Sequence, residues 1–244
     1  MPKGGAMTIQ SNLQQFTEVE TQTQFALQNA KLLKVDLNHG PVMAKLGSMV
    51  AYQGEASFKN KGSGGLGKMI KKAATGEGTS MMEVVGSGEV FLADQAADVQ
   101  IMYLSDDSIS VSGKNVLAYS ASIESDVKRI GGGVAGAMAG GLYNAHLSGT
   151  GFVAITTEGA PVMLDVGSAP TFGDAQAVVM WSSGVQMQLK TDSGGMKSMI
   201  RGGTGETFQM GFSGQGFVLV QPSEGPPAVA GGGGGGGLLD ALGG

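Results

Sequence analysis

The chain has 244 residues, of which only 14% are charged, while 44 are glycine and none is cysteine. This composition is typical of packed strands joined by many turns, and it excludes disulfides and thiolate metal sites. The net charge of −5 gives no general attraction to nucleic acid. Because Met1 to Gln10 has no apolar signal segment and no run approaches the roughly 18 apolar residues of a membrane span, we expect a cytoplasmic protein.

Short segments of alternating apolar residues recur along most of the chain. Phe25 to Leu37 predicts two strands, and an apolar strand passes through Met49 to Tyr52. Further strands are predicted at 89–92, 99–104, 108–111, 116–123, 152–156, 162–166, 178–181, 185–189, 208–212 and 217–220. Strands this short, separated by Gly, Ser and Asp, indicate a mainly β protein, either a sandwich or a barrel.

Two features repeat three times. An aromatic residue closes a short apolar strand at Tyr52, Tyr119 and Trp181, which lie 67 and 62 residues apart. A Gly-x-Gly pair opens an alternating run at Gly86 and Gly88, Gly149 and Gly151, and Gly214 and Gly216. These spacings predict three repeats of about 65 residues, built as a β-sandwich, with the aromatics serving core or interface packing rather than a ligand cage.

Three insertions precede the Gly-x-Gly strands: Gly65 to Ala74, Ile130 to Leu142 and Ser198 to Gly203. In the first, Leu66, Met69, Ile70 and Ala73 share one face of a predicted short helix. The second contains too many glycines to hold a helix alone, so it suits close packing or a mobile flap.

Several stretches resemble a known family. They are 65–68, 71–73, 75–77 and 85–90 in the first repeat, and 205–208 and 212–221 in the third. They look like the altered-inheritance-of-mitochondria family, whose domain is similar to the tryptophan RNA-binding attenuation protein fold. The resemblance spans about Phe25 to Pro222. It implies a repeat-built β-sandwich, bacterial members of unknown role, a mitochondrial branch linked to inner-membrane organisation, and no catalytic residues. The second repeat departs from the pattern, since glycine and alanine fill the segment before Asn144.

The segment Gly62 to Met69 satisfies the spacing of a phosphate-binding loop. Such a loop needs a hydroxyl after its lysine for magnesium, and Met69 occupies that position. It must also follow a buried strand, whereas Phe58 to Lys61 is polar. We therefore expect no nucleotide and no other cofactor.

Five lysines lie within fourteen residues: Lys59, Lys61, Lys68, Lys71 and Lys72. A solvated helix face explains them, and so does an anionic docking surface for lipid headgroups. RNA phosphate is a further alternative, suggested by the namesake of the fold, but the chain is acidic and has few aromatics for base stacking.

Catalytic and metal-binding patterns are missing from the sequence. His39 and His146 are the only histidines, and a metal site would need carboxylates from elsewhere. No Gly-x-Ser-x-Gly elbow occurs. The acids at 106–107 and 124–126 lie in predicted turns or at strand ends, and we expect no acid/base pair from them. We expect no metal and no enzyme.

The carboxyl end differs from the rest of the chain. After Val220 a Pro- and Gly-rich linker, residues 223–237, leads to a tip containing Leu238, Leu239 and Leu242. These leucines would share one face of a helix formed on a partner; the alternative is an unstructured tail with incidental leucines.

Together the features predict four parts: a lead-in at 1–24, a β domain at 25–222, the linker at 223–237 and the tip at 238–244. The predicted function is a non-catalytic interaction or assembly module that binds a protein partner or its own copies. Peripheral binding to membranes or other anionic ligands through Lys59 to Lys72, and RNA binding, are the alternatives.

Overall fold

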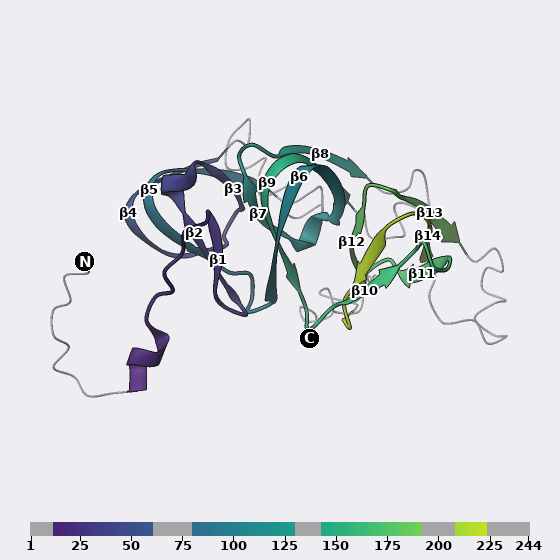
Figure 1. Ribbon diagram of the computed structural model, residues 1–244, viewed down its shortest axis with the longest axis horizontal. Helices are drawn as coiled ribbons and strands as arrows, with labels where there is room; N and C mark the ends of the chain where they lie inside the picture. The colour runs from purple at the N-terminus through teal and green to yellow at the C-terminus, as the bar shows by residue number, and fades with distance from the viewer. Residues whose placement is uncertain (1–11, 61–79, 130–142, 192–207, 224–244) are drawn as a thin grey trace, which may run out of the picture.

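The described part of the chain is almost entirely β-structure. The computed structural model describes residues 12–60, 80–129, 143–191 and 208–223, and its strands curve into an arch (Figure 1). These residues form fifteen strands and three short 3-10 helices, η1 (Asn12–Phe16), η2 (Leu37–His39) and η3 (Gly113–Asn115). Twelve strands make one antiparallel sheet, and three make a second. The mainly β class predicted from the alternation is confirmed.

After β1 (Phe25–Asn29), which pairs with β2, the strands fall into three consecutive groups that we call triplets. In each, a central strand lies between a first and a second outer strand. The first triplet consists of β2 (Leu32–Asp36) with β3 (Val42–Lys45), then β4 (Met49–Asn60), and β5 (Met81–Leu92) at the centre. The second consists of β6 (Asp98–Ser112), then β7 (Val116–Ser120) with β8 (Glu124–Arg129), and β9 (Tyr143–Thr157) at the centre. The third consists of β10 (Val162–Asp165) with β11 (Thr171–Asp174), then β12 (Val178–Ser182) with β13 (Val185–Thr191), and β14 (Phe208–Gly214) with β15 (Phe217–Val220) at the centre.

The triplets share one register. The aromatic of the second outer strand lies opposite a central valine in the pairs Tyr52–Val90, Tyr119–Val153 and Trp181–Val218. The first outer strand meets the same valines in the pairs Val35–Val90, Met102–Val153 and Leu164–Val218, and continues in Val42–Val84, Ile109–Leu147 and Thr171–Phe212. An irregularity just before each aromatic also recurs, at Met49/Ala51, Val116/Ala118 and Val178/Met180. Residues with the same pairing are called equivalent below.

The Gly-x-Gly pairs mark the sharp bends of the central strands. All six glycines have a positive φ, between 111° and 155°. A Cβ on Gly86 would lie 2.0 Å from the carbonyl oxygen of Glu55, and one on Gly88 would lie 2.2 Å from that of Gln53. The prediction that each pair opens a strand is wrong for the first two pairs, which lie inside β5 and β9; in the third, Gly214 ends β14 and Gly216 directly precedes β15. Without a Cβ the backbone bends and remains against its neighbour, so the strands run longer than the alternation suggested.

Neighbouring triplets join through a second repeated pairing. The first outer strand of one triplet pairs with the second outer strand of the next, β3 with β7 and β6 with β12. The registers match: Val42–Ser120, Met43–Tyr119 and Ala44–Ala118 correspond to Ile109–Ser182, Ser110–Trp181 and Val111–Met180. Successive triplets are therefore placed side by side in the same way.

Three apolar clusters follow the three triplets. The first cluster includes Leu117 and Ala118, which belong to β7 of the second triplet. The second cluster includes Val179 and Met180, which belong to β12 of the third triplet. Each of these two cores is thus completed by residues of the next triplet.

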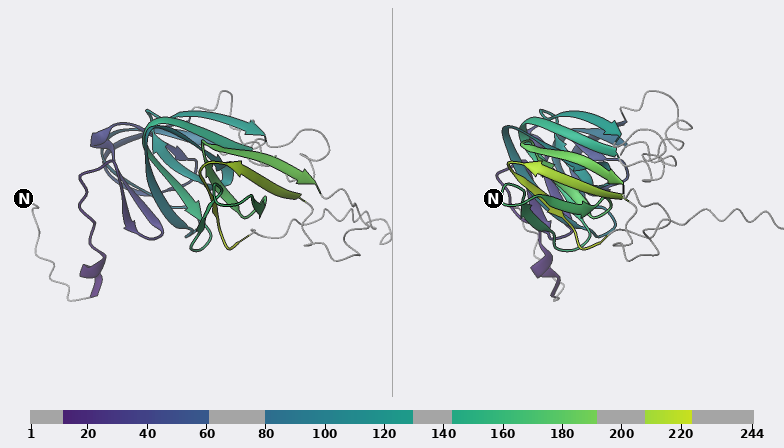
Figure 2. Two further views of the ribbon diagram at one scale, coloured as in Figure 1. Left: turned by 45° about the vertical axis from the view of Figure 1, so that its right-hand side comes forward. Right: turned by 90° about the vertical axis from the view of Figure 1, so that its right-hand side faces the viewer.

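The three triplets follow one another along the long axis of the molecule. The first and third lie at opposite ends, as both views agree (Figures 1 and 2). No helix within the described ranges is long and apolar enough to cross a membrane. The predicted helix at 65–74 and the insertions at 130–142 and 198–203 lie outside these ranges.

Replacing Gly86 by alanine tests the close approach of β5 to the backbone of β4. Gly47 is the control, since it also has a positive φ but a Cβ there meets nothing within 4 Å. We expect Gly86→Ala to lower the free energy of unfolding by about 2 kcal/mol or more, because the backbone of β4 must move as well, and Gly47→Ala to cost only about 1 kcal/mol of φ strain. Equal losses of unfolding free energy for the two variants in denaturant titrations would show that the close approach of β5 to β4 does not require a glycine.

Candidate functional site

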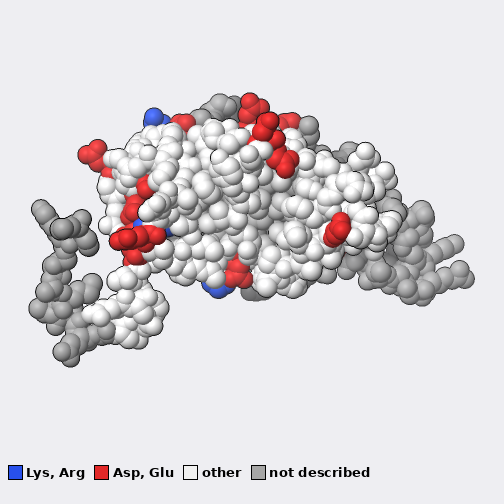
Figure 3. Space-filling view, in the orientation of Figure 1, with Lys and Arg blue, Asp and Glu red and all other residues white. Residues whose placement is uncertain are grey.

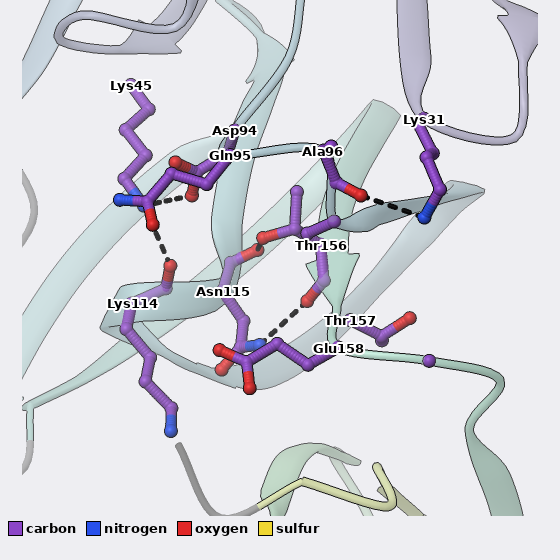
Figure 4. Close-up of a pocket in the computed structure, with 12 residues that line it drawn as sticks. Lys31, Lys45, Asp94, Gln95, Ala96, Lys114, Asn115, Thr156, Thr157 and Glu158 are labelled. Atoms are coloured by element: carbon purple, nitrogen blue, oxygen red, sulfur yellow. Dashed lines mark hydrogen bonds and ion pairs between the residues drawn. The ribbon is translucent and has the colours of Figure 1, made fainter. Parts of the chain in front are cut away.

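A polar pocket of about 480 Å³ lies where the triplets meet. It is lined by the turn after β5, by η3 and by the end of β9, together with two lysines from the first triplet (Figure 4). The charged groups lining it are Lys31, Lys45, Asp94, Lys114 and Glu158. A pocket with three lysines is the natural place to look for an anion or a catalytic amine.

The lysines of the pocket are already used by the protein. Lys31 donates to the carbonyl oxygen of Ala96 (2.8 Å) and pairs with Asp98 (2.9 Å). Lys45 pairs with Asp94 and donates to the carbonyl oxygen of Lys114 (3.0 Å). Lys114 donates to the carbonyl oxygen of Gln176 in the third triplet (2.8 Å). These contacts fasten loops from all three triplets together.

The side chain of Lys114 is partly buried, and this burial affects its pKa. Partial burial lowers the pKa of its ammonium, against the opposing effect of Glu158 and Asp174. A lowered lysine pKa is common where an amine acts as a base or nucleophile. Here the ammonium of Lys114, in the second triplet, donates to Gln176 of the third. This structural contact accounts for its burial without a catalytic role.

The turn above the pocket is strained. Gln95 and Ala96 both adopt a positive φ, 47° and 57°, and the amide of Ala97 donates to the carbonyl oxygen of Asp94 at 2.8 Å. Two consecutive left-handed residues form a type I′ turn, which favours Asn-Gly, so Gln-Ala costs about 1–2 kcal/mol per residue. Lys31 and Lys45 hold both ends of this turn.

Relief of this strain is measurable. Gln95→Asn combined with Ala96→Gly should raise the free energy of unfolding by about 1 kcal/mol, or the melting temperature by roughly 2–4 °C, because both residues suit the turn. Ala97→Gly is the control, since Ala97 has no positive φ; it should lower stability. A loss of stability in the double variant would contradict the assignment of strain.

A second polar cluster lies under the lead-in to β1. Lys34 is buried in β2, where its Nζ contacts Glu18 (2.6 Å), Glu89 (2.7 Å) and the carbonyl oxygen of Val19 (2.7 Å). Gln53 of β4 also donates to Glu18, at 3.0 Å. The lead-in is exposed throughout 12–20, so these polar contacts rather than apolar burial hold it to the sheet.

The electrostatics of this cluster are coupled. A hydrogen bond between the two carboxyl groups lowers the pKa of Glu18 and raises the pKa of Glu89. Burial opposes the charge on Lys34, yet the hydrogen bonds and charges of both glutamates outweigh it and raise its pKa. One buried ammonium thus holds two neighbouring carboxyl groups in place.

Lys34→Met should release the lead-in. A glutamyl endopeptidase should then cleave at Glu18 and Glu20 faster than in the unchanged protein, because the two carboxyl groups lose their shared cation. Since the pKa of Lys34 is raised above 10.5, its contribution is complete below that pH and is lost only as the pH rises through the folded-state value. Cleavage of the unchanged protein should therefore stay slow from neutral pH to about pH 10. Lys31→Met is the control, and equal cleavage of both variants would contradict this role.

An exposed apolar face lies at each end of the arch. On the side shown in Figure 3 charged groups are sparse and most of the body is uncharged. We call Met49, Val50 and Tyr52 of β4 the leading face, and Val162, Met163 and Phe172 of β10 and β11 the trailing face. All six side chains are exposed by at least 39%.

The leading face is unusual because its equivalents are buried. Val50 is 61% exposed, whereas the equivalent Leu117 and Val179 are 0% exposed. Tyr52 is 49% exposed, whereas Tyr119 and Trp181 are 5% and 6% exposed. Tyr119 and Trp181 thus pack in the interior, whereas Tyr52 lies outside the core, with its ring centroid 5.5 Å from that of Phe58. The aromatics that the spacing treated alike therefore differ in their surroundings.

The other predicted site residues are dispersed or lie outside the described ranges. Lys59 is exposed on β4, while Lys61, Lys68, Lys71 and Lys72, and also Leu238, Leu239 and Leu242, lie outside. His39 contacts Asp36 (3.3 Å) and His146 lies near Ser110 (3.5 Å), so the two histidines are not brought together. The described residues hold no group of three His, Cys, Asp or Glu placed to bind a metal. The cluster around Lys34 was not predicted. Its only signal in the sequence is a lysine between two apolar residues of a strand.

These features define a class: an all-β protein of glycine-bent antiparallel strands, with apolar faces at its two ends. A family model described as mitochondrial biogenesis AIM24 matches residues 24–223. The chain belongs to this family, as the resemblance in the sequence indicated. A crystal structure of a Streptococcus pyogenes protein from a structural genomics programme has the same fold, with a TM-score of 0.65 and 22% identity over 82% of this chain and 92% of that one. No curated protein matches.

Proposed function

We propose that the chain is a non-catalytic interaction and assembly module. The observation that carries this proposal is the pair of exposed apolar faces, of which the leading face has equivalents that are buried at the junctions with a neighbouring strand. Apolar side chains clustered at a strand edge are typical of surfaces that pair with another chain.

A non-catalytic role is supported by the way that the polar groups are used. The pocket lysines donate to carbonyl oxygens that join the triplets, and Lys34 anchors the lead-in. Groups committed to such structural contacts leave little for acid–base chemistry or for a cofactor.

We also propose that the triplets are three copies of one unit of about 65 residues, related to the sandwich of the attenuation protein. The shared register and the shared positions of the six glycines support this proposal. A cytoplasmic bacterial setting is part of the same proposal, since a chain without cysteine suits a reducing compartment. Anionic docking through Lys59 to Lys72, RNA binding and docking of the Leu238 to Leu242 tip stay predictions.

The proposal is tested by comparing the proteins captured in the native host by tagged full-length chain and by its Val50→Lys variant. Lysine on the leading face should remove a defined set of captured proteins, because burying its charge against an apolar partner is unfavourable. Val127→Lys is the matched control, since Val127 is an equally exposed apolar residue on β8, away from both end faces. Identical captured sets for all three proteins, measured by quantitative mass spectrometry, would contradict the proposal.

A further inference from the structure

The two junctions inside the molecule define what each end face lacks. At both junctions a three-residue stretch of a first outer strand lies opposite an aromatic and its neighbours on the next triplet: 42–44 on 118–120, and 109–111 on 180–182. The equivalent stretch on the third triplet is 171–173 of β11, and the equivalent aromatic stretch on the first triplet is 51–53 of β4. Both stretches lie on strands that end their part of the sheet.

The junctions also complete the cores. Leu117 and Ala118 enter the cluster of the first triplet, and Val179 and Met180 enter that of the second. Among the described residues, the cluster of the third triplet consists of its own side chains alone. The residues that would enter it by the same rule are Val50 and Ala51, and Val50 stands exposed at the other end of the molecule.

Exposure on the trailing face fits this account. Val162 and Met163 of β10 are 53% and 65% exposed; their equivalents in the first triplet, Leu33 and Lys34, are buried where β1 and the lead-in contact β2. Phe172, which is 51% exposed, occupies the position of Met43 opposite Tyr119. Each end therefore carries one half of the junction that is found twice inside.

We propose that a second copy of this chain fills the third triplet, with β4 of that copy paired to β11 in the register Thr171–Gln53, Phe172–Tyr52 and Gly173–Ala51. This proposal rests on the proposed assembly function and names its partner. The chain does not complete the junction on itself, because β4 and β11 lie at opposite ends of the arch (Figure 1). The contact joins two different faces, so it is head-to-tail and continues until a ring closes or a filament forms.

The side chains suit this register. Gln53 and Thr171 place a polar pair where the internal junctions have a serine opposite an aliphatic residue, and Tyr52 brings an aromatic ring against Phe172. Gly173 and Ala51 form a pair of small residues, as Ala44 and Ala118 do at the first junction, where the second junction has Val111 and Met180. No charged residue lies in the three proposed pairs.

The test uses purified full-length protein and two variants that each disable one face, Val50→Lys on the leading face and Phe172→Lys on the trailing face. Both positions are at least half exposed, so the variants should keep the melting temperature, which is checked first. By sedimentation over a concentration series, the unchanged protein and Val127→Lys should exceed the mass of one chain, and each disabled variant alone should stay at that mass.

Mixing the two disabled variants is the decisive step. One intact leading face and one intact trailing face remain in the mixture, so a head-to-tail contact gives a 1:1 pair and nothing larger. Assembly of either variant alone, or no pair in the mixture although the unchanged protein assembles, would overturn the proposed register. If the unchanged protein stays at the mass of one chain while the capture experiment still loses partners with Val50→Lys, the proposed function stands and the self-association is wrong.

Discussion

The fold depends on positions where two paired strands leave no room for a side chain between them. At Gly86 and Gly88 the central strand of the first triplet lies against the carbonyl oxygens of β4, at distances that no Cβ tolerates. Of the equivalent glycines, Gly149 and Gly214 also face backbone carbonyl oxygens, whereas Gly151 and Gly216 face the side chains of Ser120 and Ser182. Those serines accept hydrogen bonds from the amides of Phe152 and Phe217, at 2.9 and 3.0 Å. In two triplets, therefore, a serine hydroxyl accepts the hydrogen bond of the central-strand amide that follows the second glycine.

The cores of the first and second triplets are shared with the triplet that follows. Leu117 of the second triplet packs into the cluster of the first, and Val179 of the third packs into the cluster of the second. Cooperation between triplets is therefore built into the packing, since removing one triplet would expose apolar residues of the one before it. The polar pocket adds to this cooperation, because its lysines link loops of different triplets.

Much of this arrangement was predictable from the sequence, and the reasons for the failures are physical. The aromatic and glycine spacings identified equivalent positions, because a bend without a Cβ and a buried ring both need particular residue types. Strand length was underestimated, since a glycine in a strand looks like a strand end when only alternation is considered. The cluster of Glu18, Lys34 and Glu89 was missed because its members come from three distant segments. Tyr52 was grouped with Tyr119 and Trp181, although only a neighbouring triplet decides which of them is covered.

Proteins built by stacking equivalent units usually end in units whose outer face is polar, because an apolar end remains in water. Here the lead-in could have served as such a cap, yet it is held by Glu18 and by backbone contacts, and its own Leu13 and Phe16 remain exposed. Within the part of the chain that the structure describes, the lead-in therefore leaves Val50 and Tyr52 exposed. At the other end Val162 and Met163 are as exposed as the apolar side chains of the leading face. An array with complementary apolar faces at both ends has the geometry of a segment of a longer assembly. This geometry favours a head-to-tail contact over a symmetric one, since each face matches the opposite end of the molecule and is not complementary to a copy of itself.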